Sequence, residues 1–341
     1  MPLKLHFLNV GHGDCTIIEF PSDRLTVVDI NRSEDLVGEE VVEIAKGAGW
    51  DATGVAAASR WRLADLPTDF IKAAGLMPLC DPLGYLDTYF PRRDIFRFVA
   101  THPDMDHLSG LGGLLKTRNV LNFWHVADGI AKEDFDESRY DLADWEGYEH
   151  AREGISSPKA VSPKRLEANH YWKEDGMSIW SPSTDLESLA ESTDDPNLAS
   201  YVLALRYGKA LVVLGGDANV SAWDDVYSHF GGELPKATVL KASHHGRKSG
   251  YHQPSVECLS PDLTIISVGK KPPSDASQLY AQYSDAALST RHHGSIVVTV
   301  HEQGNSSYES DRTRHDDDAK GEAQLYALKS ALPLIRQLTQ A

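Results

Sequence analysis

A short run of ligand-type side chains directly after an apolar stretch constrains this 341-residue chain more than any other feature. The stretch is Ile95–Ala100, and the run His102–His107 holds two imidazoles and two carboxylates. Pro103 biases the residue before it toward extended backbone, which predicts a strand that ends and a loop that begins here. Side chains of these types, this close together, can converge on one or two cations. The sequence therefore predicts a metal-binding loop with these ligands: His102, Asp104, Asp106 and His107.

Two further strands end in side chains of the same kinds. Leu211–Leu214 is apolar and runs into Gly215, Gly216 and Asp217, which places a carboxylate on a tight turn. Thr238–Lys241 runs into the imidazoles of His244 and His245. Three strands thus deliver ligand-type side chains to what we expect to be one edge of a two-sheet domain.

The order and approximate spacing of these motifs resemble the metallo-β-lactamase superfamily. Within it they resemble the branch that contains the nuclease domain of ComEC, and the second half is also similar to a bacterial phosphorylcholine esterase. The matching segments are Leu8–Asp14, Val28–Asp29, Thr101–Leu111, Asn197 with Ser200, Gly216–Asp217 and His244–Gly246.

The resemblance implies the α/β class and a four-layer αββα sandwich of the metallo-β-lactamase type. We expect one domain over residues 1–341, because the chain shows no sequence repeat and no long linker. Segments at about 47–93 and 127–175 lack the expected strand pattern and are predicted to be insertions. Residues 319–339 carry an amphipathic pattern that predicts a C-terminal helix.

The resemblance also implies how the ligands divide between two divalent metal ions. Asp106 and His107 would hold one cation together with His244 or His245, and these two histidines stay alternatives. Asp217 would bridge to a second cation held by His102 and Asp104. Asp104 stands where the wider superfamily has a histidine, and neither His125 nor His170 is placed as a third histidine ligand. Because several ligands are carboxylates, zinc and manganese both stay open.

Charge limits the substrate classes. The net charge of −17 weighs against indiscriminate binding to nucleic acid. Residues 236–248, however, carry four bases and no acid. An anionic substrate is therefore allowed at that end of the molecule. The residues expected to bind it are Lys241, Arg247, Lys248, Asn197 and Ser200.

These observations predict a metal-dependent hydrolase, specifically a phosphodiesterase or nuclease that uses a metal-activated water. Asp106, Asp217 and His245 are the expected catalytic residues, and nucleic acid or another phosphodiester is the expected substrate. One alternative is a metallo-hydrolase of a small ester, phosphocholine or cyclic nucleotide. Another is a metal-poor binding or scaffold subunit, with the acidic insertion as the surface for a protein partner.

Three cysteines without a CxxC motif favour a reducing compartment, and no apolar run is long enough to span a bilayer. With no signal-peptide pattern at the start, we expect a cytoplasmic protein with no membrane contact. His12 and the pair His292–His293 are expected to be turn residues. Cys15 lies in a strand-like segment and is expected to be a core residue.

Overall fold

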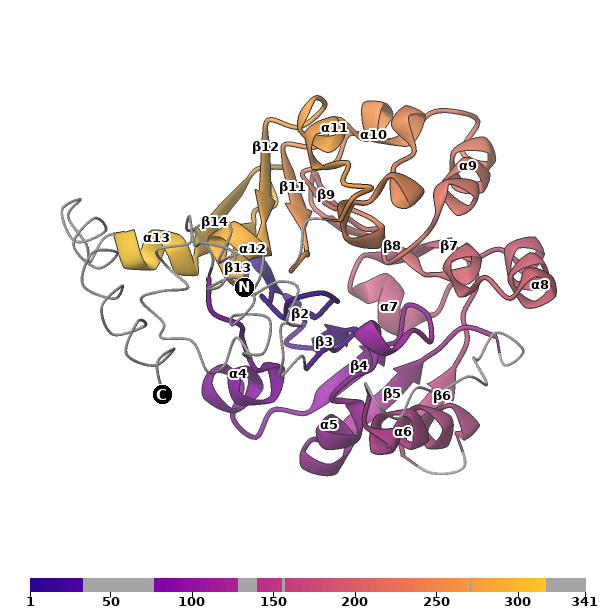
Figure 1. Cartoon of the computed structure of the whole chain (residues 1–341), viewed down its shortest axis with the longest axis vertical. Coiled ribbons are helices and arrows are strands. Elements are labelled where there is room, and N and C mark those ends of the chain that lie inside the picture. Colours follow the sequence, from indigo (N-terminus) through magenta and orange to yellow (C-terminus); the bar gives the residue numbers. More distant parts are fainter. Residues whose placement is uncertain (33–76, 128–139, 155–156, 270–271, 317–341) are drawn as a thin grey trace, which may run out of the picture.

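The computed structural model describes residues 1–32, 77–127, 140–154, 157–269 and 272–316. In these ranges the chain forms two sheets that face each other, with helices outside them (Figure 1). The first sheet has the following strands in spatial order: β14 (Ser306–Ser310), β13 (Ile296–Val300), β1 (Leu3–Phe7), β2 (Thr16–Glu19), β3 (Leu25–Val28), β4 (Ile95–Val99), β5 (Val120–Trp124) and β6 (Lys159–Val161).

The second sheet contains the strands that precede Asp217 and the His244–His245 pair. Its strands, in spatial order, are β12 (Ala286–Ser289), β11 (Leu263–Ile266), β10 (Val239–Lys241), β9 (Ala210–Leu214), β8 (Val202–Tyr207) and β7 (Met177–Ser181). The described helices are α4 (Pro82–Tyr89), α5 (Leu111–Thr117), α6 (Leu142–Glu153), α7 (His170–Glu174), α8 (Thr184–Thr193), α9 (Val220–His229), α10 (Gln253–Leu259), α11 (Ser277–Ala281), α12 (Thr290–His293) and α13 (Asp311–Asp316).

Two apolar cores hold these layers together. One contains Leu5 and Ile18 of the first sheet together with strands of the second sheet and helix α9. The other contains Ile17 and Phe98 together with helices α5 and α6. Ile17 and Ile18 enter different cores because successive side chains of a strand point to opposite faces of the sheet. The predicted α/β class and αββα sandwich are confirmed.

The topology brings the motif-bearing loops to one edge. Strands β3 and β4 are parallel, so Asp29 and the loop after Ala100 leave the first sheet at the same end. Strands β9, β10 and β11 are also parallel, so Asp217 and His245 leave the second sheet together. Ligands commonly bind at the carboxyl ends of parallel strands, where loops converge.

The predicted insertions are described only in part. Of the first, residues 47–76 lie outside the described ranges, and helix α4 follows them. The second supplies α6, α7 and strand β6, which pairs with β5 in the first sheet. The predicted C-terminal helix also lies outside the described ranges. Within those ranges, no helix combines the length and apolar character needed to cross a bilayer.

Candidate metal centre

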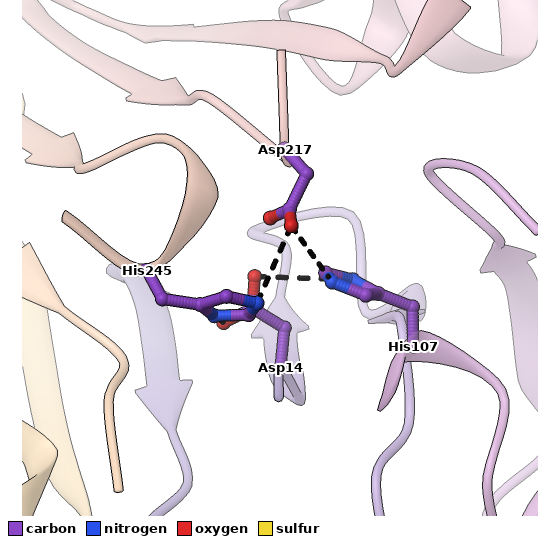
Figure 2. Close-up of side chains that lie close together, drawn as sticks. All are labelled: Asp14, His107, Asp217 and His245. Atoms are coloured by element: carbon purple, nitrogen blue, oxygen red, sulfur yellow. Dashed lines mark ion pairs between the residues drawn. The ribbon is translucent and has the colours of Figure 1, made fainter. Parts of the chain in front are cut away.

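Four buried side chains from four loops meet between the two sheets. Figure 2 shows His107 and His245 on either side of Asp217, with Asp14 below them. One potential ligand atom from each lies within 4.8 Å of the others. Asp217 Oδ2 lies 3.4 Å from His107 Nε2 and 3.3 Å from His245 Nε2. The His102–His107 loop, Asp217 and the His244–His245 pair therefore do come together.

The remaining predicted ligands lie next to these side chains. His102 Nε2 and His244 Nε2 each lie 4.0 Å from Asp217 Oδ2. Asp104 Oδ2 lies 3.5 Å from His102 Nε2, and Asp106 Oδ2 lies 3.3 Å from His245 Nε2. His245 is the more deeply buried of the neighbouring pair, with 1% of its side chain exposed against 17% for His244.

The hydrogen bonding of this cluster fits divalent cations. Among the described residues, the Nε2 atoms of His102, His107 and His245 are buried without a hydrogen-bond partner, as is Oδ1 of Asp217. Buried polar atoms are almost always satisfied, so unpaired atoms that converge on one spot need an explanation. Imidazole nitrogens and carboxylate oxygens are ligands for zinc and for manganese. The residues present therefore suit metal ions of this kind.

The Nδ1 atoms of His107 and His245 each contact an oxygen acceptor on the far side of the ring from Nε2. His107 Nδ1 lies 2.8 Å from Asp29 Oδ2, and His245 Nδ1 lies 3.2 Å from the carbonyl oxygen of Ser267. In the neutral imidazole, an acceptor at Nδ1 places the proton there and leaves the Nε2 lone pair facing Asp217. This arrangement is the usual support for a metal-binding histidine, because it fixes both the tautomer and the ring orientation.

The backbone that presents the ligands is strained on the side of the second sheet. His244 and His245 adopt left-handed conformations, with φ of 50° and 54°. Such a conformation is unfavourable for residues with a Cβ, and two in succession are held only by their surroundings. Gly246 follows at φ +72°, where a Cβ would lie 2.8 Å from the side chain of Ile266. The turn is thus built to direct two adjacent imidazoles inward.

Part of the segment predicted to be an acidic insertion contacts the start of α5, next to the metal-binding loop. Asp144 of α6 accepts hydrogen bonds from the backbone N–H groups of Gly110 and Gly112, at 2.7 and 2.8 Å. At Gly112 an added Cβ would come within 2.5 Å of the carbonyl oxygen of Ala143. This close approach lets α6 pack directly on the start of α5, behind the ligand loop. The insertion therefore contributes to the position of the site.

A buried ion pair lies beside the cluster. The Lys241 ammonium donates to Asp14 Oδ2, and both side chains are almost fully buried. Asp14 faces the Nδ1 atoms of His245 and His107, at 3.8 and 4.0 Å, on the side away from Asp217. Asp14 therefore supports the imidazoles, and the pairing with Lys241 offsets the cost of burying its charge.

The acids shift the pKa values of the imidazoles when no cation is present. Burial lowers the pKa of His245, but Asp217 and Asp106 outweigh it and raise that pKa to about 9. Burial likewise opposes protonation of His107, yet Asp217, Asp29 and Asp106 raise its pKa well above the usual range. Despite burial, the two histidines hold the pKa of Asp217 well below its usual value. In the metal-free protein, the imidazoles of His107 and His245 therefore favour binding a proton at the positions where cations would bind.

The residues expected to bind substrate differ in their burial and in their contacts. Lys241 is turned inward to Asp14, and Ser200 accepts a 2.9 Å hydrogen bond from the backbone N–H of Asp217. Asn197 lies on a short turn with its side-chain oxygen buried and without a partner. Arg247 points to His12, and Lys248 is exposed. Of the bases, Lys241 therefore pairs with Asp14 inside the site, and Arg247 contacts His12 next to it.

Among the described side chains, His125, His292 and His293 are not part of this cluster. His125 lies 2.6 Å from the carbonyl oxygen of Val126 through Nδ1, and His170 begins helix α7. His292 and His293 end the short helix α12 and line a separate cavity of about 250 Å³. His12, expected to be a turn residue, does lie in a turn, but its ring also faces Asp106 and His245. Cys15 is buried, as expected for a core residue.

Comparison with known proteins agrees with the motifs. The chain is 28% identical over 203 residues to ComE operon protein 3 of Bacillus subtilis, which covers 58% of this chain. It spans about a quarter of that relative's length, because the match covers 24% of it. No family model matches the chain. The match to ComE operon protein 3 confirms the predicted resemblance to the ComEC branch.

Solved structures with a similar arrangement include a metallo-β-lactamase fold protein, a metallo hydrolase and an RNase Z. YhfI from Bacillus subtilis is 11% identical, with a TM-score of 0.42 over 85% of this chain and 96% of that one. Igni18, a metallo hydrolase from Ignicoccus hospitalis, is 12% identical, with a TM-score of 0.44 over 86% and 98%. A long form RNase Z from yeast is 9% identical, with a TM-score of 0.41 over 87% and 42%.

Proposed function

We propose that this chain, which has the metallo-β-lactamase fold and resembles the ComEC branch in sequence, is a metal-dependent hydrolase of phosphodiesters. The observation that carries the proposal is the position of Asp217. One oxygen of this buried carboxylate faces four imidazole nitrogens at 3.3–4.0 Å, two on neighbouring residues of one turn. A carboxylate in this position can bridge two cations, which is the arrangement used for in-line displacement at phosphorus.

The ligands divide into two sets around Asp217. We assign Asp106, His107 and His245 to one cation. His102, Asp104 and His244 are assigned to the other. The first set follows from the 3.3 Å approach of Asp106 to His245, and the second from the 3.5 Å approach of Asp104 to His102. Asp217 belongs to both sets, and His244 then supplies the histidine that the sequence left unassigned.

If divalent cations were bound by these residues, they would supply a nucleophilic water near neutral pH and offset negative charge on phosphate oxygens. The chain's own residues orient the metal ligands and close one side of the site. Asp29 and the Ser267 carbonyl fix the imidazoles, Ser200 fixes the Asp217 backbone, and the Asp14–Lys241 pair closes the inner side of the site. Such preorganised surroundings are what lets a metal site act without reorganisation during the reaction.

Hydrolysis of bis(p-nitrophenyl) phosphate and of DNA and RNA, with zinc or manganese added, tests the proposal. Wild-type protein is expected to cleave at least one diester, and Asp217→Asn and His107→Ala are expected to fall to background. Glu191→Gln, on the exposed face of α8, serves as the control and should match wild type. Full activity in Asp217→Asn, or no diester cleavage by metal-loaded wild type, would refute it.

A small diester or ester is the second candidate substrate. Two of the four bases in residues 236–248 are engaged by acids: Lys236 pairs with Asp262 at 2.6 Å, and Lys241 pairs with Asp14. These two ammonium groups are not available to follow a polynucleotide backbone. A preference of orders of magnitude for the small diester over long polynucleotides would establish this candidate. A protein that binds less than one equivalent of metal would instead be the scaffold subunit.

A further inference from the structure

The turn that carries His12 is fixed against the metal-binding loop. Asn31 Nδ2 donates to the carbonyl oxygens of Val10 and His12, at 3.1 and 2.6 Å. Gly13, at φ +136°, lies so close to the other loop that a Cβ would come 2.3 Å from the carbonyl oxygen of Asp106. The position of His12 is therefore set by its surroundings.

The imidazole of His12 lies at the outer side of the metal-binding side chains. Its ring centroid is 4.7 Å from that of His245, and its Nε2 is 3.9 Å from Asp106 Oδ2. The same Nε2 lies 2.8 Å from a terminal nitrogen of Arg247. A guanidinium only donates, so His12 Nε2 is the acceptor of this hydrogen bond. His12 thus contacts Arg247 on one side and approaches Asp106 on the other.

Arg247 has a donor that the protein does not use. Its Nε–H is buried and has no acceptor among the residues that the structure describes. The backbone of Arg247 is held at 3.0 Å by the carbonyl oxygen of His244, which belongs to the metal-binding turn. A buried N–H without an acceptor is costly, and an anionic ligand oxygen is the partner that would satisfy it.

We propose that Arg247, oriented by His12, forms a binding site for a phosphoryl group at the outer side of the metal cluster. Arg247 provides a planar donor fork suited to two oxygens of a tetrahedral anion. His12 is a positioning residue, since it acts on the anion through the guanidinium. The inference rests on the proposed function only in taking the phosphoryl group to be that of the substrate.

Titration of inorganic phosphate into the metal-loaded protein, followed by calorimetry, tests this site. Arg247→Ala is expected to weaken phosphate binding about 10–100-fold, the range for a lost charge-assisted hydrogen bond. Arg247→Lys is expected to lose less, because the charge remains and the fork does not. Lys209→Ala, an exposed base in the turn between β8 and β9, is the matched control and should bind phosphate as wild type does.

The positioning role of His12 has its own test. His12→Ala should weaken phosphate binding, whereas His12→Gln should restore most of it, because the amide oxygen can accept from the guanidinium. Elemental analysis of each variant shows whether the metal is retained. Phosphate binding equal to wild type in metal-loaded Arg247→Ala overturns the proposal, and so does an equal loss in His12→Ala and His12→Gln. If Arg247→Ala fails to hold metal, wild-type affinity in Arg247→Lys is the overturning result.

The outcome is separable from that of the proposed function. Phosphate binding that depends on Arg247, in a protein that cleaves no diester, would refute the proposed function and support this site. Diester cleavage by a protein whose phosphate affinity is the same with and without the Arg247 side chain would support the proposed function and refute this site.

Discussion

The Nδ1 atom of His107 lies 2.8 Å from Oδ2 of Asp29, across 78 positions of the chain. The same carboxylate accepts from the backbone N–H and the hydroxyl of Thr101, both at 2.8 Å. The Thr101 hydroxyl in turn contacts His102 Nδ1 at 3.1 Å. One buried acid therefore orients a histidine from each of the two proposed ligand sets.

Asp29→Asn should lower metal affinity by about 10–100-fold, the usual cost of losing the carboxylate behind a metal-binding histidine. The amide keeps the shape of the side chain, but its NH₂ group can donate to His107 Nδ1 and shift the ring proton to Nε2. Competition with a chromophoric chelator measures the affinity, with Glu191→Gln as the surface control. An unchanged affinity in Asp29→Asn would show that Asp29 does not act through His107.

Lys241→Met should destabilise the protein by about 3–5 kcal/mol, because it leaves the Asp14 carboxylate buried and unpaired. Adding Asp14→Asn should recover much of this loss, since no uncompensated charge then remains. Lys236→Met is the matched control: its ammonium pairs with Asp262 at the surface, where ion pairs contribute little. Denaturant unfolding of wild type, Lys241→Met, Asp14→Asn and the double variant measures the cycle, and strictly additive effects would contradict the coupling.

The raised pKa of His245 gives a pH dependence with a defined sign. Burial lowers this pKa, but Asp217 and Asp106 raise it to about 9 from 6.5. The resulting stability of metal-free protein is complete below pH 6.5 and is lost as pH rises to about 9. Metal binding requires the neutral imidazole, so it becomes more favourable over the same range.

We therefore expect the Tm of metal-free protein to fall from pH 6.5 to 9, while the increase in Tm on adding zinc or manganese grows. Differential scanning fluorimetry with and without metal follows both quantities. His245→Gln should weaken both trends. A metal-free Tm that rises across this interval would contradict the assignment of the protonated imidazole.

The strands that lead to the candidate ligands could be predicted from sequence, because each is an apolar stretch. Ile95–Val99, Ala210–Leu214 and Val239–Lys241 are strands in the structure, and the candidate ligands lie in the loops that follow them. The strands β6, β12 and β14 were not predicted. Tyr308 and Glu309 in β14, for example, are exposed, so the strand lacks the apolar pattern and depends on pairing with β13.

Sequence could not predict contacts between distant residues. Lys241 looked like a phosphate ligand in a basic stretch, but its partner Asp14 lies 227 positions away. His12 looked like a turn residue, because nothing in Gly11–Gly13 shows that the turn abuts Asp106. The sequence did contain a signal for one residue that supports a ligand, because the acid Asp29 directly follows the buried strand β3.

Anomalous diffraction from crystals of protein prepared without chelator and supplied with zinc or manganese tests the central claim most directly. We expect two peaks of anomalous density, one on each side of the Asp217 carboxylate. One should lie among Asp106, His107 and His245, and the other should lie among His102, Asp104 and His244. Fully supplied crystals with no peak within coordinating distance of Asp217 would contradict it.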